Sequence, residues 1–155
     1  MKKSIGIRVA PDCIYYSIIE QGEDVFNLIL VDKIKIAKNL DFPEQLKILR
    51  TTLLDIINEN DINKACIRVT ENVSRNISIS RISIEGVVQE LIASSKIERY
   101  KVVQLANIAS ILGLKVKEVK ETIDDKLDFK MVEQFSKYKK EEKESILSAI
   151  CASKI

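Results

Sequence analysis

Apolar and polar residues alternate with a period of two along the first 36 residues of the chain. In the opening run, residues 5–9, an aliphatic side chain occupies every second position, which is the pattern of a β-strand. A Pro-Asp turn signal follows at residues 11–12, and two more strand-like runs cover residues 14–19 and 25–36. Because the connections between the runs are short, we predict a three-stranded antiparallel meander.

From residue 41 the apolar spacing changes to the period of a helix. Asp41 and Pro43 have the character of a helix start, with a capping side chain followed by a proline in the first turn. The apolar stripe of this helix then recurs at Leu46, Leu49, Leu53, Ile56 and Ile57. We therefore predict a helix that ends near Asn60.

Strand-like and helical runs alternate over the rest of the chain. The pattern predicts strands at residues 65–69 and 100–103, and helices at about 80–95, 105–112 and 140–152. Residues 115–130 carry mixed charge and predict no clear element. The element order is thus β-β-β-α-β-α-β-α, with a further helix at the end.

This order is typical of an α/β chain with the ribonuclease-H-like fold. The expected sheet is mixed and five-stranded, with a three-strand antiparallel meander, two parallel strands and flanking helices. No internal repeat or low-complexity linker interrupts the sequence. A single domain over residues 1–155 is therefore expected, and its length can bury a sizeable core.

The composition removes several classes of chemistry. The chain has no histidine, which excludes Ser-His and Cys-His nucleophilic catalysis and leaves no paired ligands for zinc. Its three cysteines are far apart and lie among apolar residues, as expected of reduced thiols in a cytoplasmic protein. No stretch reaches the ~20 apolar residues of a membrane span, so we expect no membrane partner.

Five segments carry a resemblance to a known family. Residues 5–10 read Ile-Gly-Ile-Arg-Val-Ala, and residues 68–73 read Arg-Val-Thr-Glu-Asn-Val. An Arg-Asn pair at 75–76 and a Gly-containing helix around 84–87 follow, and residues 140–150 form an acidic helix start with an apolar stripe. In this order the segments resemble the RuvC-type Holliday-junction resolvases, whose first strand reads apolar-Gly-apolar-Asp-Pro-Gly.

The resemblance implies a two-metal nuclease site. In such nucleases, carboxylates from the first strand, the fourth strand and the last helix hold two divalent cations, Mg²⁺ or Mn²⁺, that activate water. Carried over to this chain, Glu71 is the fourth-strand ligand. Glu142 and Ser145 occupy the positions of the two terminal aspartates. If the register differs by a residue or two, Glu141 or Glu144 takes that place.

Arg8 is the main departure from the family pattern, because it stands where the family has its central metal-bridging aspartate. The replacement changes the local charge by two units and puts a guanidinium group in the metal position. We expect Arg8 to lie close to Glu71, where an ion pair between them would occupy the site. The alternatives are a purely structural pair at the strand ends, or two solvated and unrelated side chains. The sequence therefore predicts an eroded metal site.

Two charged runs have simpler interpretations. Residues 139–144 have the composition of a solvated helix start, because acids in a first turn are favoured by the helix dipole. Asp124, Asp125 and Asp128 alternate with lysines and fit no calcium loop, which favours a polar surface over a metal cluster.

A nucleic-acid surface would depend on how the lysines are placed, because the formal charge is only +2. The candidates for contacts to nucleic acid are Lys33, Lys35, Arg75, Asn76, Lys115, Lys117, Lys139 and Lys140. Lysines on an edge strand equally serve to prevent aggregation. The two interpretations stay open at this point.

Three functional hypotheses follow. The first is a RuvC-like protein with an eroded site that binds DNA, RNA or an active partner, alone or as a homodimer. The second is an active Mg²⁺-dependent endonuclease for branched DNA that uses Glu71 and Glu142, with Glu141 or Glu144 as a further candidate ligand and Arg8 displaced from the site. The third is a protein-interaction or inhibitor module that reuses the fold without nucleic acid.

Overall fold

One mixed sheet of five strands organises the chain, and the computed structural model describes residues 2–23 and 25–155. The strands are β1 (Lys3–Val9), β2 (Cys13–Gln21), β3 (Phe26–Lys35), β4 (Ile62–Arg68) and β5 (Arg99–Val103). Their order across the sheet is β3-β2-β1-β4-β5. The first three strands pair antiparallel, whereas β4 runs parallel to both β1 and β5. The predicted meander and parallel strands are confirmed.

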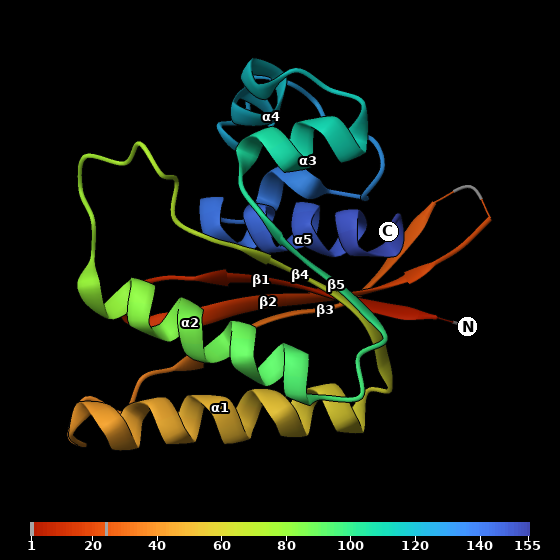
Figure 1. Cartoon of the computed structure of the whole chain (residues 1–155). Helices are drawn as coiled ribbons and strands as arrows, with labels where there is room; N and C mark the ends of the chain where they lie inside the picture. The colour runs from red at the N-terminus through yellow and green to blue at the C-terminus, as the bar shows by residue number, and fades with distance from the viewer. Residues whose placement is uncertain (1, 24) are drawn as a thin grey trace.

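Helices cover both faces of this sheet (Figure 1). They are α1 (Phe42–Glu59), α2 (Ile79–Ser94), α3 (Leu105–Leu112), α4 (Val116–Ile123) and α5 (Lys140–Ser153), with a 3-10 turn η1 at Phe135–Lys137. Figure 1 shows α1 and α2 on one face, and α5 on the other with α3 and α4 outside it. Asp41 caps α1 as predicted, because its side chain accepts a hydrogen bond from Glu44 N.

Helix α4 is an α-helix that the sequence pattern did not predict. Its eight residues alternate lysines and glutamates with few aliphatic positions, so the helical period is hard to see. Only Val119, Thr122 and Ile123 are buried, and they form a narrow stripe that packs against the α5 side of the fold. A helix this short takes its stability from such packing rather than from local propensity.

Strand β1 divides its side chains between two buried faces. Ile5, Ile7 and Val9 join the apolar core under α1 and α2. The alternate positions Ser4 and Arg8 are also buried and face the α5 side. Gly6 lies between them, and α5 approaches it so closely that an added Cβ would lie 2.0 Å from Ser145 O and 2.1 Å from Ala149 N. The middle of α5 is therefore held directly against the middle of β1.

Candidate functional site

The carboxyl ends of β1 and β4 lie side by side and bring two arginines together. Arg8 and Arg68 are register partners on these parallel strands, and both side chains are buried. The start of α5 packs over the same end of the sheet. This is the edge at which ligands gather in open α/β sheets.

Arg8 is bound to Glu144 of α5. Its Nε donates to Glu144 Oε2 at 2.7 Å, and only 7% of Arg8 and 3% of Glu144 is exposed. Arg8 Nη1 also donates to the carbonyl oxygen of Arg68 at 3.3 Å. The short distance and the exclusion of water make this a strong charge-assisted bond that joins the first strand to the last helix.

Arg68 joins Glu71 to the same network. Its Nη2 lies 3.1 Å from Glu71 Oε1 and 3.9 Å from Glu144 Oε1, and its Nη1 donates to the carbonyl oxygen of Val69. Its Nε is buried and has no hydrogen-bond partner within the described residues. Burial lowers the pKa of Arg68, and the neighbouring charge of Arg8 lowers it further.

A third arginine and a buried acid, both on α2, also lie at the carboxyl ends of β1 and β4. Arg81, in the first turn of α2, donates from Nε to the carbonyl oxygen of Val9 at 2.8 Å. Burial lowers the pKa of Arg81, as does the charge of Arg8. The carboxylate of Glu85 accepts from Thr70 N and Thr70 Oγ1, with the latter at 2.9 Å. These bonds tie α2 to the end of β4.

The predicted direct pair between Arg8 and Glu71 is wrong. Arg8 pairs with Glu144, and Glu71 instead pairs with Arg68 and accepts from Leu105 N at 2.7 Å. Arg68 connects the two pairs, because its guanidinium group lies near both Glu71 and Glu144. Arg68 was not selected from the sequence, although an arginine at the end of the apolar run 65–69 was a usable signal.

The interpretation of residues 139–144 as a solvated helix start is also wrong in part. Lys143 and Glu144 are buried, whereas Glu141 and Glu142 are half-buried. Glu142 accepts from Lys139 N at 2.9 Å and so caps the helix. A helix that packs over the sheet from its first turn buries part of that turn, which the charge pattern cannot reveal.

Ser145, at the second family aspartate position, makes neutral hydrogen bonds. Its Oγ lies 2.5 Å from Ser17 Oγ and donates to the carbonyl oxygen of Glu142 at 2.7 Å. Ser17 pairs with Gly6 across β1 and β2, and small residues at both positions let α5 approach. The Ser145 hydroxyl therefore helps to hold α5 against the sheet.

The residues at this edge do not fit a two-metal centre. Mg²⁺ needs several oxygen ligands in near-octahedral geometry. Glu71 and Glu144 are both held by guanidinium groups, and Glu142 is used as a helix cap. In residues 2–23 and 25–155, no group of three acidic or cysteine side chains is placed to share one ion. A guanidinium group occupies the position expected for the bridging carboxylate.

The acidic run after α4 lies on the surface, as its charge alternation indicates. Asp124, Asp125 and Asp128 are all exposed. Asp125 has a second role, because its Oδ1 lies 2.5 Å from Nζ of the buried Lys143. This ion pair holds the segment after α4 against α5. The thiols Cys13, Cys66 and Cys151 are buried and free, as predicted.

The predicted nucleic-acid residues lie on several elements. Lys33 is on β3, in one row across the sheet with Tyr15, Arg8 and Arg68. Arg75 and Asn76 are exposed in the loop between β4 and α2. The exposed lysines Lys115, Lys117, Lys139 and Lys140 lie at the starts of α4 and α5, and Lys35 lies at the end of β3.

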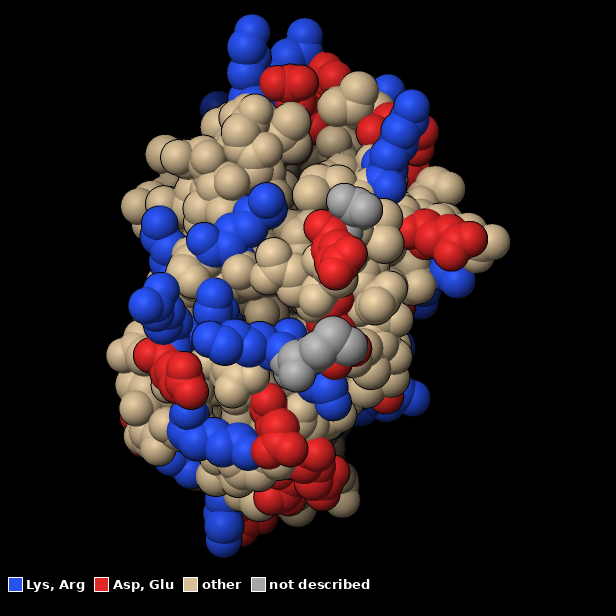
Figure 2. Space-filling view, turned by 90° about the vertical axis from the view of Figure 1, so that its right-hand side faces the viewer, with Lys and Arg blue, Asp and Glu red and all other residues tan. Residues whose placement is uncertain are grey.

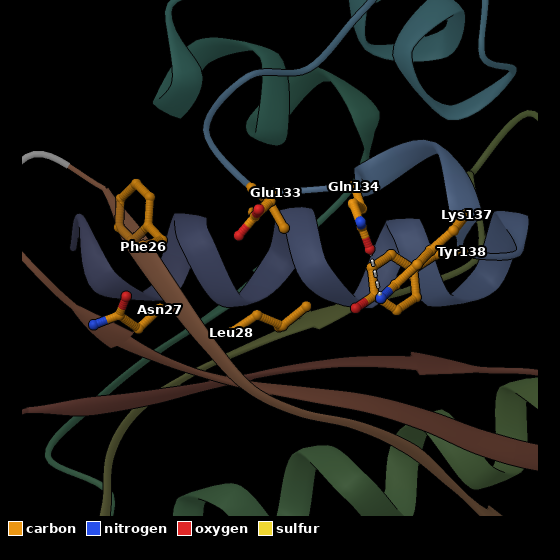
Figure 3. A pocket seen from close by; sticks show the side chains of 8 residues that line it. Phe26, Asn27, Leu28, Glu133, Gln134, Lys137 and Tyr138 are labelled. Carbon is orange, nitrogen blue, oxygen red and sulfur yellow. Dashed lines mark hydrogen bonds between the residues drawn. The ribbon is translucent and has the colours of Figure 1, made fainter.

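Two cavities are relevant to a binding role. One, of about 230 Å³, lies over the ion-pair network and is lined by Arg8, Arg68, Leu105, Lys120, Ile123, Asp124, Lys140 and Glu144. Another, of about 380 Å³, lies between edge strand β3 and the segment before α5, with Phe26 and Tyr138 at its sides (Figure 3). The second contains none of the arginines of the network, so the first is the candidate site.

The opposite end of the molecule has a different charge pattern. Figure 2 shows the end at which both chain termini lie, away from the start of α5. Basic and acidic side chains both cover this face, with the basic ones gathered toward one side of the view.

In the part of the chain that the structure describes, no helix is long and apolar enough to cross a membrane.

No protein-family model matches the chain, and no curated protein matches its sequence. Solved structures do match its fold. The RuvC structure of Thermus thermophilus superposes with a TM-score of 0.73 at 11% identity, covering 97% of this chain and 93% of that one. T. thermophilus RuvC in complex with a Holliday junction substrate gives a TM-score of 0.70 at 9% identity, covering 97% and 92%.

These similarities establish the fold as ribonuclease-H-like and RuvC-like over almost the whole chain. At about one identical residue in ten, they do not extend to the activity, because one fold hosts many functions. The site itself must supply the functional argument.

Proposed function

We propose that this chain is a nucleic-acid-binding protein that uses a RuvC-like fold to bind a phosphodiester backbone without cutting it. The observation that carries the proposal is the buried bond between Arg8 and Glu144. The Arg8 guanidinium group lies at the central position of the site and binds the Glu144 carboxylate, which is therefore not free to bind a metal ion. The family resemblance alone implies that the phosphodiester is hydrolysed. With this site we propose that the protein binds the phosphodiester but does not hydrolyse it.

The placement of cations supports contact with a backbone. Lys33, Arg8 and Arg68 share one row of the sheet, and neighbouring strands are about 4.8 Å apart. Lys120 and Lys140 stand over the same edge. Cations placed along one edge can follow the phosphates of one strand, and such contacts supply most of the affinity in non-specific binding.

Branched DNA is the substrate class that we propose first, since RuvC of T. thermophilus has been solved with a Holliday junction substrate. The match covers 92% of that protein, which supports comparing almost its whole fold with this chain. A cytoplasmic location, self-association as a homodimer and pairing with an active partner stay predictions.

The first test is a calorimetric titration of Mg²⁺ and of Mn²⁺ into the wild type and an Arg8→Asp variant. We expect no binding by the wild type, because Glu71 and Glu144 are engaged by arginines. The variant releases Glu144 from its 2.7 Å bond to Arg8 and adds a carboxylate, so it is expected to gain metal affinity. Metal binding by the wild type that Glu71→Gln abolishes would instead favour the active endonuclease.

The second test measures binding to a four-way junction and to a linear duplex of equal length at increasing salt. If the protein neutralises Z phosphates, log K falls against log salt with a slope of about −0.9Z. The Lys33→Gln/Lys35→Gln variant should reduce that slope, and Lys126→Gln/Lys130→Gln is the control with the same charge change. Absence of salt-dependent binding to either DNA would favour the protein-interaction alternative.

A further inference from the structure

The cavity over the ion-pair network has more positive than negative charge in its wall. Four cationic side chains, Arg8, Arg68, Lys120 and Lys140, face two acids, Asp124 and Glu144. Glu144 is already bound to Arg8 at 2.7 Å. Neither Lys120 nor Lys140 has an ion-pair partner among residues 2–23 and 25–155. The wall therefore has positive charge available for a ligand.

Arg68 points independently to an acceptor that the protein does not supply. It is 3% exposed and lines the cavity, yet its Nε has no partner in the described chain. A buried N–H group without an acceptor is unfavourable, and native proteins rarely leave one. Only a ligand oxygen that accepts a hydrogen bond from this Nε would remove that cost.

Size and shape narrow the ligand class. The volume of about 230 Å³ is below the roughly 300–1,000 Å³ of pockets that enclose drug-sized ligands, so the part of a ligand that enters this cavity is a small group. Among small anions, phosphate presents several acceptor oxygens that match the planar donor fork of arginine, with lysines adding point charges.

We propose that Arg8, Arg68, Lys120 and Lys140 form a phosphate pocket that binds one backbone phosphate directly, without a bridging metal ion. In RuvC-type nucleases, as the resemblance implies, carboxylates hold metal cations at this position. In this chain the cationic side chains themselves would contact the phosphate. This inference rests on the proposed function, because it names the group through which the nucleic acid enters the site.

The decisive experiment follows the arginine Nε–Hε signals of ¹⁵N-labelled, chelator-treated protein during titration with inorganic phosphate. The signal of Arg68 is expected to move saturably, and added EDTA should leave the affinity unchanged. The Lys120→Gln/Lys140→Gln variant removes two exposed charges at the mouth without touching the buried pairs. It should weaken phosphate binding at least about tenfold, since a hydrogen bond to a charged group is worth about that factor.

The matched control is Lys126→Gln/Lys130→Gln, which removes two exposed lysines from outside the cavity wall. Its phosphate affinity should equal that of the wild type. An Arg68 signal that stays in place, moves only when Mg²⁺ is added, or responds equally in the two double variants would overturn the pocket.

Junction DNA binding separates this failure from failure of the proposed function. If DNA binds with equal affinity to both double variants and phosphate leaves Arg68 unaffected, the pocket is wrong and nucleic-acid binding stands. If phosphate moves Arg68 but no protein binds DNA, the anion pocket stands and the proposed function is overturned. Weaker DNA binding by Lys120→Gln/Lys140→Gln alone supports both.

Discussion

The two faces of the sheet are buried by different kinds of side chain. Under α1 and α2 the core is a continuous aliphatic cluster that includes Ile5, Ile7, Leu53 and Leu91. Under α5 an apolar cluster is also present, but serines, Arg8, Arg68, Lys143 and Glu144 are buried in the same layer. The α1 and α2 face buries one acid, Glu85 of α2, whereas the α5 face combines close packing with several buried charges.

The difference shows how much a buried site depends on its surroundings. On the apolar face each side chain gains from leaving water regardless of its exact partner. On the α5 face each buried charge is favourable only if its counter-charge is in place, since desolvation is expensive. The α5 face should therefore be the more sensitive to single changes, and four experiments test this.

Gly6 should show the largest effect. An alanine there would place its Cβ within 2.1 Å of two backbone atoms of α5, so the helix must move off the sheet. We expect Gly6→Ala to cost about 4 kcal/mol or more in the free energy of unfolding. Denaturant titration measures it.

Gly86→Ala is the control for this change on the α2 side. Nothing lies within 4 Å of an added Cβ at Gly86, and alanine favours a helix interior, so a gain of about 0.5–1 kcal/mol is expected. Equal effects of the two substitutions would contradict the close approach of α5 to β1.

Glu144→Gln should show the next largest effect. The change keeps the volume of the side chain but leaves Arg8 charged and buried without its counter-ion, which is expected to cost about 3 kcal/mol. The comparison is Glu90→Gln, which breaks the exposed pair between α1 and α2 in which Glu90 lies 3.2 Å from Arg50. That loss should be much smaller, because solvent screens the pair. Similar losses in chemical unfolding would remove the distinction between the faces.

The buried thiols under α5 should make stability fall at high pH. Burial raises the pKa of Cys66 and of Cys151 to about 12, from an ordinary value of 9.0. Between these values the unfolded chain releases thiol protons that the folded chain keeps, so stability is full below pH 9 and falls as the pH rises toward 12.

At pH 10 the loss is expected to be roughly 1.4 kcal/mol for each thiol, because that pH is one unit above the unfolded value. Unfolding of the wild type and of a Cys66→Ala/Cys151→Ala variant should be compared at pH 7 and pH 10. The same pH dependence in both proteins would show that other groups cause it.

Lys143→Met should show the smallest effect. Lys143 Nζ lies 2.5 Å from Asp125 Oδ1 and 5.8 Å from the centre of the Phe135 ring, with its stem buried. Methionine fills the same space and needs no desolvation, so we expect a change within about 1 kcal/mol in thermal or denaturant unfolding. Lys143→Ala, which leaves a cavity, should cost more. A loss with methionine as large as with alanine would mean that the charge itself stabilises this contact.

Much of the candidate site could be selected from the sequence, because the family resemblance marked Arg8, Glu71 and the start of the last helix. The sequence could not show which acidic residue of the last helix pairs with Arg8. Glu142, Glu144 and Ser145 lie within four residues of one another, and a shift of a few residues along the helix decides which of them faces the sheet. Glu144 faces it because α5 seats against Gly6 and Ser17, a contact that joins distant segments.

The sequence by itself determined the element order apart from α4 and η1, the meander, the capped helix at Asp41 and the placement of an arginine at a carboxylate position. These depend on local periodicity and residue type, which every segment carries within itself. Only the tertiary structure decided that Glu144 binds Arg8, that Arg68 completes the network, and that Lys120 and Lys140 share its cavity. The physical reason is that Coulomb and desolvation energies depend on distances in space between residues of different elements, such as Arg8 and Glu144, which are 136 positions apart, and the packing of α5 on the sheet sets those distances.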